Sequence, residues 1–296
     1  MHPLIIGKDS LNWGQRTYVM GILNLTPDSF SGDGLLVPSS LSPQGEQPGL
    51  QEARRFLAAG ADILDIGGES TRPGSQPVDT AEELQRVLPS LRAILAAFPD
   101  ALISIDTYKA AVAEDALKAG AAIVNDIWGL RADPDLAKVV ARYQATVVLM
   151  HNRSKPANVE VRERLGKAYL GAKYQDLLED VKRELIESVA IAHSAGIADE
   201  HIILDPGIGF GKTVAQNLEL INRLGEIRAL GFPVLLGPSR KSFIGYTLNL
   251  PPDQRLEGTA ACVAIGIARG ADIVRVHDVE PILRVAHMTD AIVRHK

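Results

Sequence analysis

Residues 59–67 read Ala-Gly-Ala-Asp-Ile-Leu-Asp-Ile-Gly, and this stretch decides the fold because it joins the end of one element to the start of the next. Its first glycine stands where an amphipathic helix should end, since glycine readily adopts the left-handed backbone that closes many helices. The same joint recurs as Ala-Gly-Ala-Ala at 119–122 and as Arg-Gly-Ala-Asp at 269–272. This repetition predicts a chain built from repeated helix-to-strand units.

Short β-branched apolar runs alternate with longer amphipathic segments along the chain. The runs are nearly continuous in apolar residues, as expected for parallel strands buried on both faces. The predicted strands are 18–25, 63–66, 102–105, 123–126, 146–150, 202–205, 234–237 and 273–276. The clearest helical patterns between them cover 81–97, 109–119, 173–195 and 258–268.

Eight such units without a domain-breaking linker predict a single α/β domain over residues 1–296, a closed (β/α)8 TIM barrel. An open doubly wound sheet is the alternative, and the absence of G-x-G-x-x-G after the first strand weakens it. Two insertions interrupt the rhythm, at 31–49 and 151–171. Long loops in barrels often lie on the face that carries the chemistry, although the second insertion fits a plain surface loop equally well.

Composition narrows the functional class. The 296 residues exceed the roughly 250 that such a barrel needs, and 46% are hydrophobic and 23% charged, as in an ordinary globular enzyme. The net charge of −5 provides no basic surface for nucleic acid or for an anionic membrane. The single cysteine, Cys262, excludes an internal disulfide and fits a reducing compartment, and the start of the chain has no leader pattern. We therefore predict a cytoplasmic protein.

Polar side chains stand at or just beyond the carboxyl end of almost every predicted strand, where barrel enzymes place their active sites. They are Asn24, Glu69, Asp106, Asn125, His151, Asp205, Lys241, Arg275 and His277. A single such residue is as often a turn or helix cap as a functional group. Their gathering on one predicted rim is hard to explain by capping, and it predicts an active site.

The residue types indicate a site with two ends. Carboxylate and amide groups suit the N–H and amino edge of a flat heterocycle; here they are Asp106, Asn125 and Asp205. Cationic and imidazole groups suit phosphate oxygens; here they are Arg72, Lys241, Arg275 and His277. The sequence has neither zinc-ligand spacing nor a G-x-S-x-G elbow, and Gly-Ile-Gly-Phe-Gly-Lys at 207–212 is only a weak phosphate-loop pattern.

Five motifs in order resemble the dihydropteroate synthase family over nearly the whole chain. They are Met-Gly-Ile-Leu-Asn-Leu-Thr-Pro-Asp-Ser-Phe at 20–30, Gly-Gly-Glu-Ser-Thr-Arg-Pro-Gly at 67–74, Asp-Pro-Gly-Ile-Gly-Phe-Gly-Lys at 205–212, Ser-Arg-Lys-Ser-Phe-Ile-Gly at 239–245 and Arg-Val-His-Asp at 275–278. The resemblance implies a transferase of folate biosynthesis, a target of sulfonamides. It would join (7,8-dihydropterin-6-yl)methyl diphosphate to p-aminobenzoate and release diphosphate. It also implies Mg²⁺ as cofactor and a homodimer.

The resemblance assigns roles residue by residue. Asn24 would ligate Mg²⁺, and Asp106, Lys241 and Arg72 would act in catalysis. The pterin diphosphate would be bound by Thr71, Asp106, Asn125, Asp205, Lys241, Arg275 and His277. The p-aminobenzoate pocket would comprise Arg72, Pro73, Phe210 and Ser242.

Two other readings stay open at this point. A pterin-dependent methyltransferase on the same barrel would share the heterocycle slot, but it has no diphosphate to hold, so Arg275 and His277 speak against it. A pterin-binding barrel without activity is the rival from another class, because a fold alone does not imply activity.

Overall fold

The predicted closed barrel is confirmed. The computed structural model describes residues 4–294 except 7–8, 27–48, 71–73, 156–158 and 163. Its central sheet has eight parallel strands, in the order β3, β4, β5, β6, β7, β10, β11 and β12 around the barrel. They are Tyr18–Asn24, Ile63–Gly67, Ile103–Asp106, Ile123–Asp126, Thr146–Met150, Ile202–Asp205, Leu235–Leu236 and Ile273–Val276. A parallel bridge between Leu204 and Val234 closes the circle, so the open-sheet alternative is wrong.

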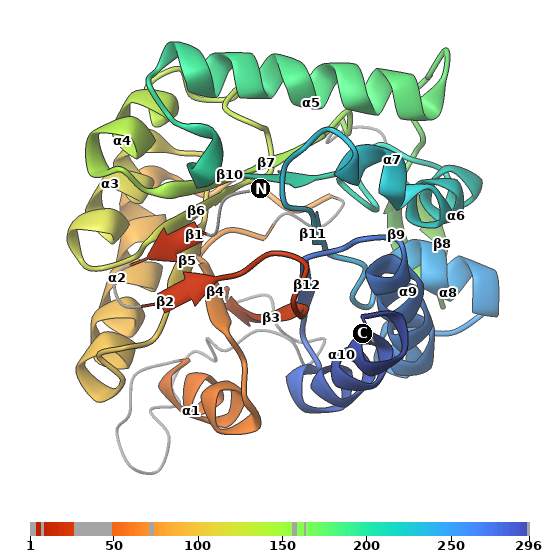
Figure 1. Cartoon of the computed structure of the whole chain (residues 1–296), viewed down its shortest axis with the longest axis horizontal. Helices are drawn as coiled ribbons and strands as arrows, with labels where there is room; N and C mark the ends of the chain where they lie inside the picture. The colour runs from red at the N-terminus through yellow and green to blue at the C-terminus, as the bar shows by residue number, and fades with distance from the viewer. Residues whose placement is uncertain are drawn as a thin grey trace.

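Helices follow the strands and surround the barrel (Figure 1). They are α1 Leu50–Ala59, α2 Thr80–Ala97, α3 Ala110–Lys118, α4 Leu136–Tyr143, α5 Leu177–Ser194, α6 Val214–Asn222, α7 Leu224–Arg228, α8 Ser242–Leu248, α9 Leu256–Ala268 and α10 Val279–Val293. None of the helices in the described part of the chain is long and apolar enough to cross a membrane.

The three repeated joints share one geometry. Gly60, Gly120 and Gly270 all have left-handed backbone, with φ of 104°, 111° and 99°. After each glycine, the next backbone N–H donates to a carbonyl of the last helical turn; Ala61, for example, donates to Phe56 O at 2.9 Å. This hydrogen bond closes the helix and turns the chain into the following strand, as the sequence pattern predicts.

The amino-terminal segment forms a hairpin that the sequence analysis did not predict. Strands β1 (Leu4–Ile6) and β2 (Asp9–Leu11) pair antiparallel, and Leu4 and Leu11 are buried. They pack on an apolar layer contributed by the first residues of the barrel strands. The hairpin therefore closes the amino end of the barrel and leaves the carboxyl end as the face that can receive a substrate.

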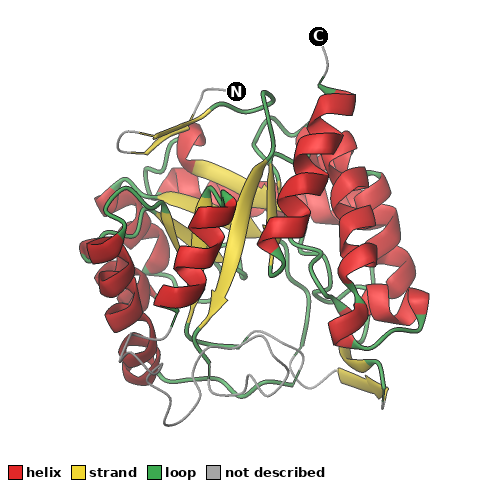
Figure 2. Ribbon diagram, turned by 90° about the horizontal axis from the view of Figure 1, so that it is seen from below, coloured by secondary structure: helices red, strands yellow, loops and turns green. Residues whose placement is uncertain are grey.

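The insertion at 151–171 contains a second hairpin, at the opposite end of the barrel from the first (Figure 2). It consists of β8 (Val159–Arg162) and β9 (Gly166–Tyr169). Arg255, 3% exposed, donates to Leu165 O at 2.8 Å, and the Tyr246 hydroxyl donates to Gly166 O at 3.3 Å. These contacts tie the hairpin to the segment that follows β11. The insertion predicted at 31–49 lies outside the described residues except for Gly49.

Candidate active site

The period of two along each strand explains why polar groups reach the barrel interior. Apolar residues such as Ile63, Ile123 and Ile273 form the interior layer at the amino end. The side chain two positions further along each strand also points into the barrel, and it lies one layer closer to the carboxyl end. At this level lie Asp65, Asn125, Asp205 and Arg275. The barrel interior is thus apolar at its closed end and polar toward its carboxyl end.

Strand register places two predicted site residues on either side of a gap. Asn24 pairs with Gly67, and Gly67 pairs with Asp106 on the next strand. A Cβ placed on Gly67 would lie 3.7 Å from Asp106 Oδ2 and 3.8 Å from Asn24 Oδ1. Because Gly67 has no side chain, the amide and the carboxylate face the same open space. Asn125 pairs with Asp106 and continues the row.

An ion-pair cluster lies beneath this row. Arg275 Nε donates to Asp65 Oδ2 and Arg275 Nη2 donates to Asp106 Oδ2, both at 2.6 Å. Asn125 Nδ2 donates to the same Asp65 oxygen at 3.1 Å. Arginine has five N–H donors. Within the part of the chain that the structure describes, two of them bond to these carboxylates, and the other three can serve an anionic ligand. The predicted residues Asp106, Asn125 and Arg275 therefore lie together.

Asp65, fully buried at the centre of this cluster, is a residue that the sequence analysis missed. Its apolar neighbours in Ile-Leu-Asp-Ile at 63–66 make it look like part of a strand core. A signal was nevertheless present, because Asp65 is the fifth residue after Gly60. Asn125 and Arg275 stand at the same distance from Gly120 and Gly270. The repeated joint therefore places three polar residues at equivalent positions.

The cluster holds its charges in a buried environment. Burial raises the pKa of Asp106 to about 7, with the positive charge of Arg275 opposing that rise. Burial disfavours the charged form of Arg275, but Asp65 and Asp106 outweigh it and hold its pKa above the usual range. Arg275 is thus a permanent cation whose neighbour Asp106 responds to pH near neutrality.

Asp205 occupies the opposite side of the rim. Its Oδ1 accepts a hydrogen bond from Gly207 N at 2.7 Å, and the carboxyl group is 6% exposed. Burial raises its pKa, whereas Lys241 lowers it. One carboxylate oxygen therefore organises the turn after β10, and within the described residues no donor is bonded to the other oxygen. Asp205 therefore both stabilises the turn through Oδ1 and presents Oδ2 at the rim as a hydrogen-bond acceptor.

The structure brings Lys241 and Phe210 together. The Lys241 ammonium lies 4.5 Å from the centre of the Phe210 ring and donates to Ile208 O. Burial lowers the pKa of Lys241 to about 8. Arg240 has a left-handed backbone, with φ of 55°, and its guanidinium pairs with Asp278 at 2.6 Å. This turn directs Arg240 away from Lys241, which begins helix α8 together with Ser242.

His277 follows β12 and lies beside the same turn, with its Nδ1 3.0 Å from Ser239 Oγ. The predicted residues Thr71, Arg72 and Pro73 lie outside the described residues. Glu69, two residues before Thr71, is held by an ion pair. Lys109 Nζ donates to Glu69 Oε2 at 2.6 Å and to Glu83 Oε2 at 2.5 Å. Glu69 therefore belongs to a largely buried ion-pair cluster with Lys109 and Glu83.

His151, predicted only as a polar residue at a strand end, is fully buried. Its Nδ1 lies 3.0 Å from Lys212 Nζ, and its Nε2 lies 3.1 Å from Glu184 Oε2. Burial and the charge of Lys212 lower the pKa of His151 to about 4. Burial alone would raise the pKa of Glu184, but the close contact with His151 and the hydrogen bonds from Arg153 outweigh it and lower that pKa. His151 is therefore neutral beside an ionised Glu184.

We expect His151 to make folding stability depend on pH. The unfolded chain takes up a proton at this residue near pH 6.5, whereas the folded chain does so only near pH 4. The unfolded state therefore binds more protons within this window, and stability is lost as the pH falls from 6.5 toward 4. At about 1.4 kcal/mol per pH unit, the free energy of unfolding should fall by on the order of 3 kcal/mol relative to a His151→Gln variant.

Urea unfolding of both proteins at pH 7 and at pH 4.5 measures this difference. The comparison between the two proteins removes the contributions of titrating groups that do not contact His151, such as Asp106. Parallel pH profiles would contradict the buried neutral state of His151.

Comparisons with known proteins show the family of the chain. The model of the pterin binding enzyme family matches residues 20–277. A dihydropteroate synthase from Clostridium beijerinckii is 50% identical over 98% of this chain and 99% of its own length. The crystal structure of a Clostridium difficile dihydropteroate synthase in the presence of pteroic acid is 47% identical, with a TM-score of 0.81 over 96% of this chain and 99% of that one. A Yersinia pestis dihydropteroate synthase with a sulfonamide drug is 40% identical, with a TM-score of 0.86 over 98% and 99%.

A barrel whose rim combines buried carboxylates, an amide and a permanent cation fits the class of pterin-binding enzymes. Within that class, the chain belongs to the dihydropteroate synthase family.

Proposed function

We propose that this chain joins (7,8-dihydropterin-6-yl)methyl diphosphate to p-aminobenzoate, giving 7,8-dihydropteroate and diphosphate. The observation that carries the proposal is the joint placement of Asp106, Asn125 and Arg275 on one rim, in a chain with 50% identity to a dihydropteroate synthase. A methyltransferase has no diphosphate to hold, so the Arg275 cation at the rim favours the diphosphate-releasing enzyme over that rival.

The reaction requires cleavage of the bond between the methylene carbon and the diphosphate oxygen, and attack by the arylamine nitrogen on that carbon. Asp205 and Asn125 would hold the pterin edge through hydrogen bonds. Asp106 would lie beside the ring and stabilise positive charge that develops on it as the bond breaks. Arg275 and His277 would stabilise the departing diphosphate, and Lys241 would lie between the ring and Phe210. The attacking amine would be placed by the pocket that Phe210 and Ser242 border.

Magnesium fits this rim. Mg²⁺ usually keeps several waters and takes one or two protein oxygens together with substrate phosphates. Asn24 offers one amide oxygen facing the gap over Gly67, and no cluster of three acidic, histidine or cysteine side chains competes for a metal among the described residues. When bound, Mg²⁺ would neutralise charge on the leaving diphosphate. Asn24 would orient it toward that group.

Release of diphosphate tests the proposed function directly. We expect the purified chain to release diphosphate only when both the pterin methyl diphosphate and p-aminobenzoate are present with Mg²⁺. Methyl transfer from a methylated pterin would support the rival enzyme instead. Pterin binding without any diphosphate release would support the inactive barrel.

Replacing Asp205 by asparagine should weaken pterin binding. The change substitutes an N–H donor for a carboxylate oxygen, so two donors would face each other at the heterocycle. We expect a loss of about 1.5–3 kcal/mol in pterin affinity, the scale for hydrogen bonds to charged groups. Calorimetric titration with a bare pterin measures it. Loss of thermal stability with unchanged pterin affinity would show that Asp205 only organises the turn at Gly207.

We also propose that the protein is a cytoplasmic homodimer. Exposed apolar side chains on the adjacent helices α9 and α10 support a second copy as partner: Ile265 is 50% exposed, Met288 63% and Ile292 65%. The single cysteine, Cys262, supports the location, since a chain with one cysteine has no internal disulfide and fits a reducing compartment.

A further inference from the structure

The loop between β10 and α6 contains a buried lysine that the proposed reaction does not use. Lys212 is 3% exposed. Its Nζ lies 3.0 Å from His151 Nδ1, 2.9 Å from Gly207 O and 3.1 Å from Phe210 O. An ammonium group has three N–H donors, so these three acceptors satisfy all of them.

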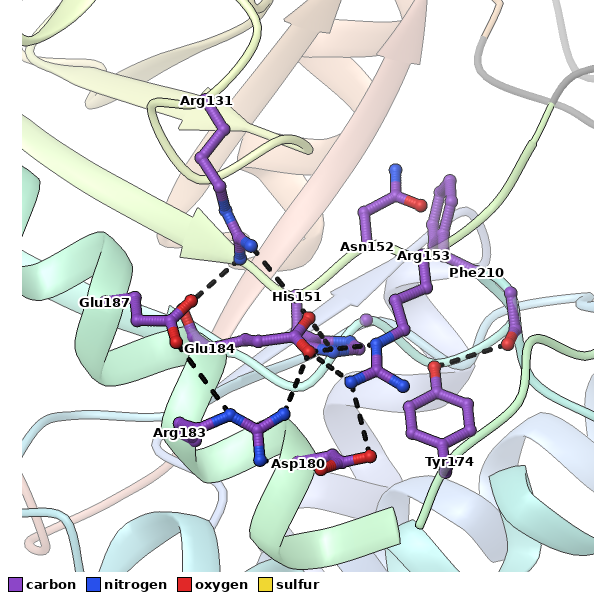
Figure 3. A network of polar contacts seen from close by, with 12 residues as sticks. Arg131, His151, Asn152, Arg153, Tyr174, Asp180, Arg183, Glu184, Glu187 and Phe210 are labelled. Atoms are coloured by element: carbon purple, nitrogen blue, oxygen red, sulfur yellow. Dashed lines mark hydrogen bonds and ion pairs between the residues drawn. The ribbon is translucent and has the colours of Figure 1, made fainter. Parts of the chain in front are cut away.

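The orientation of His151 follows from this contact. Because Nδ1 accepts from the ammonium, the proton of the neutral ring lies on Nε2, which faces Glu184 Oε2 at 3.1 Å. Glu184 in turn accepts from Arg153 Nε at 2.9 Å, and Arg131 and Arg183 lie around it (Figure 3). A continuous series of polar contacts therefore runs from helix α5 through His151 to Lys212.

The backbone of this loop needs such an anchor. Gly207, Gly209 and Gly211 all have positive φ, at 69°, 84° and 64°, which no other residue type adopts as readily. A Cβ on Gly207 would lie 1.8 Å from His151 O, so the loop packs directly against the end of β7. Lys212 ties the two carbonyls of Gly207 and Phe210 to that strand end.

The anchored loop carries groups of the proposed arylamine pocket. The Phe210 ring lies 6.1 Å from the Tyr169 ring of the second hairpin and 4.5 Å from the Lys241 ammonium. Ile208, between the two anchored residues, accepts the hydrogen bond from Lys241. A shift of this loop would therefore displace Phe210 and remove the acceptor that holds Lys241.

We propose that Lys212 is a positioning residue for the arylamine substrate, which acts by fixing the loop that holds Phe210 and Lys241 in place. His151 contacts the Lys212 side-chain nitrogen directly, and Glu184 contacts the opposite side of the His151 ring. The proposal rests on the proposed function in one respect, namely that Phe210 borders the p-aminobenzoate pocket. The pterin depends less on this loop than p-aminobenzoate does. Its proposed contacts Asp106, Asn125 and Asp205 belong to strands β5, β6 and β10, and of its proposed contacts Lys241 is the one that the loop holds through Ile208 O.

Calorimetric titration separates the two substrates. The proteins compared are the unmodified chain, Lys212→Met, and Lys138→Met as a control for loss of an exposed lysine, which is 69% exposed in its pair with Asp135. We expect Lys212→Met to bind p-aminobenzoate about 10- to 100-fold more weakly in the presence of pterin, pyrophosphate and Mg²⁺, since small misplacements are costly at such sites. Affinity for the bare pterin should change by less than about threefold, within the net value of one hydrogen bond, and Lys138→Met should bind both normally.

Unchanged p-aminobenzoate affinity, or an equal loss for both ligands, would overturn the positioning role. Should Lys212→Met fail to fold, Glu184→Gln decides, because it keeps Lys212 and the loop while weakening the hold on His151. It should lower p-aminobenzoate affinity selectively, by about three- to tenfold, and an unchanged affinity would overturn the proposal. Lack of turnover in the unmodified chain would instead contradict the proposed function, because these titrations do not depend on turnover.

Discussion

Replacing Arg275 by methionine should nearly abolish turnover and destabilise the fold. Arg275 pairs with the buried Asp65 and Asp106 at 2.6 Å, so its loss leaves two buried carboxylates without a counter-charge. Removal of one partner of a buried pair costs about 3–5 kcal/mol. Loss of a donor to the leaving diphosphate should also lower kcat by about 10²–10³-fold. Urea unfolding and the diphosphate-release assay measure the two effects.

The barrel offers a matched control at its closed end. Arg228 pairs with Asp272 at 2.8 Å, and Asp272 is 2% exposed, comparable with the pairs of Arg275. Arg228→Met should lose stability but keep kcat, because Arg228 lies at the amino end of the barrel, opposite the rim that carries the proposed active site. Equal kinetic losses in the two variants would contradict a role of Arg275 in the reaction, and would indicate that both variants act only through stability.

Removal of Mg²⁺ should stop turnover, and Asn24→Ala should reproduce much of that loss. If Asn24 orients a metal bound to diphosphate, the variant should bind pyrophosphate more weakly in the presence of Mg²⁺. Its affinity for a bare pterin should be unchanged, since Asp205 and Asn125 are intact. Titration of pyrophosphate with and without Mg²⁺ measures the effect independently of activity.

Asn24→Asp provides the conservative control for the metal. A carboxylate oxygen is also a good Mg²⁺ ligand, so this variant should keep a metal-dependent affinity for pyrophosphate. Undiminished turnover in excess chelator would contradict a role of Mg²⁺ in the reaction. A response of Asn24→Asp as severe as that of Asn24→Ala would argue against direct ligation by this residue.

The barrel could be predicted because its determinants are local. A few consecutive residues are enough to specify each helix-closing glycine and each apolar strand, as at 59–67. The two hairpins escaped prediction for different reasons. Strand β1 has three residues, which are too few to show a period of two. Its function in closing the barrel depends on the contact of Leu4 with the apolar layer at the amino end of the barrel, which comes from residues distant in sequence. In β8, Val-Glu-Val-Arg at 159–162 does alternate, and a turn at Gly166 was a usable signal.

The site could be predicted as a set of residue types but not as a network of contacts. Asp106, Asn125 and Asp205 stand at strand ends, where topology alone brings them to one rim. The ion pair between Arg275 and Asp65 joins residues 210 positions apart, and depends on side-chain reach across the barrel interior. Lys212 likewise reads as part of a glycine-rich motif until the fold places His151 beside it.

A crystal structure of the chain with pterin methyl diphosphate and Mg²⁺ would show whether these residues bind the substrate. We expect the heterocycle to lie against Asp205, Asn125 and Asp106, and the diphosphate to contact Arg275 and His277 with the metal at Asn24. A heterocycle bound away from Asp205, or a diphosphate that leaves Arg275 bound only to Asp65 and Asp106, would contradict this expectation.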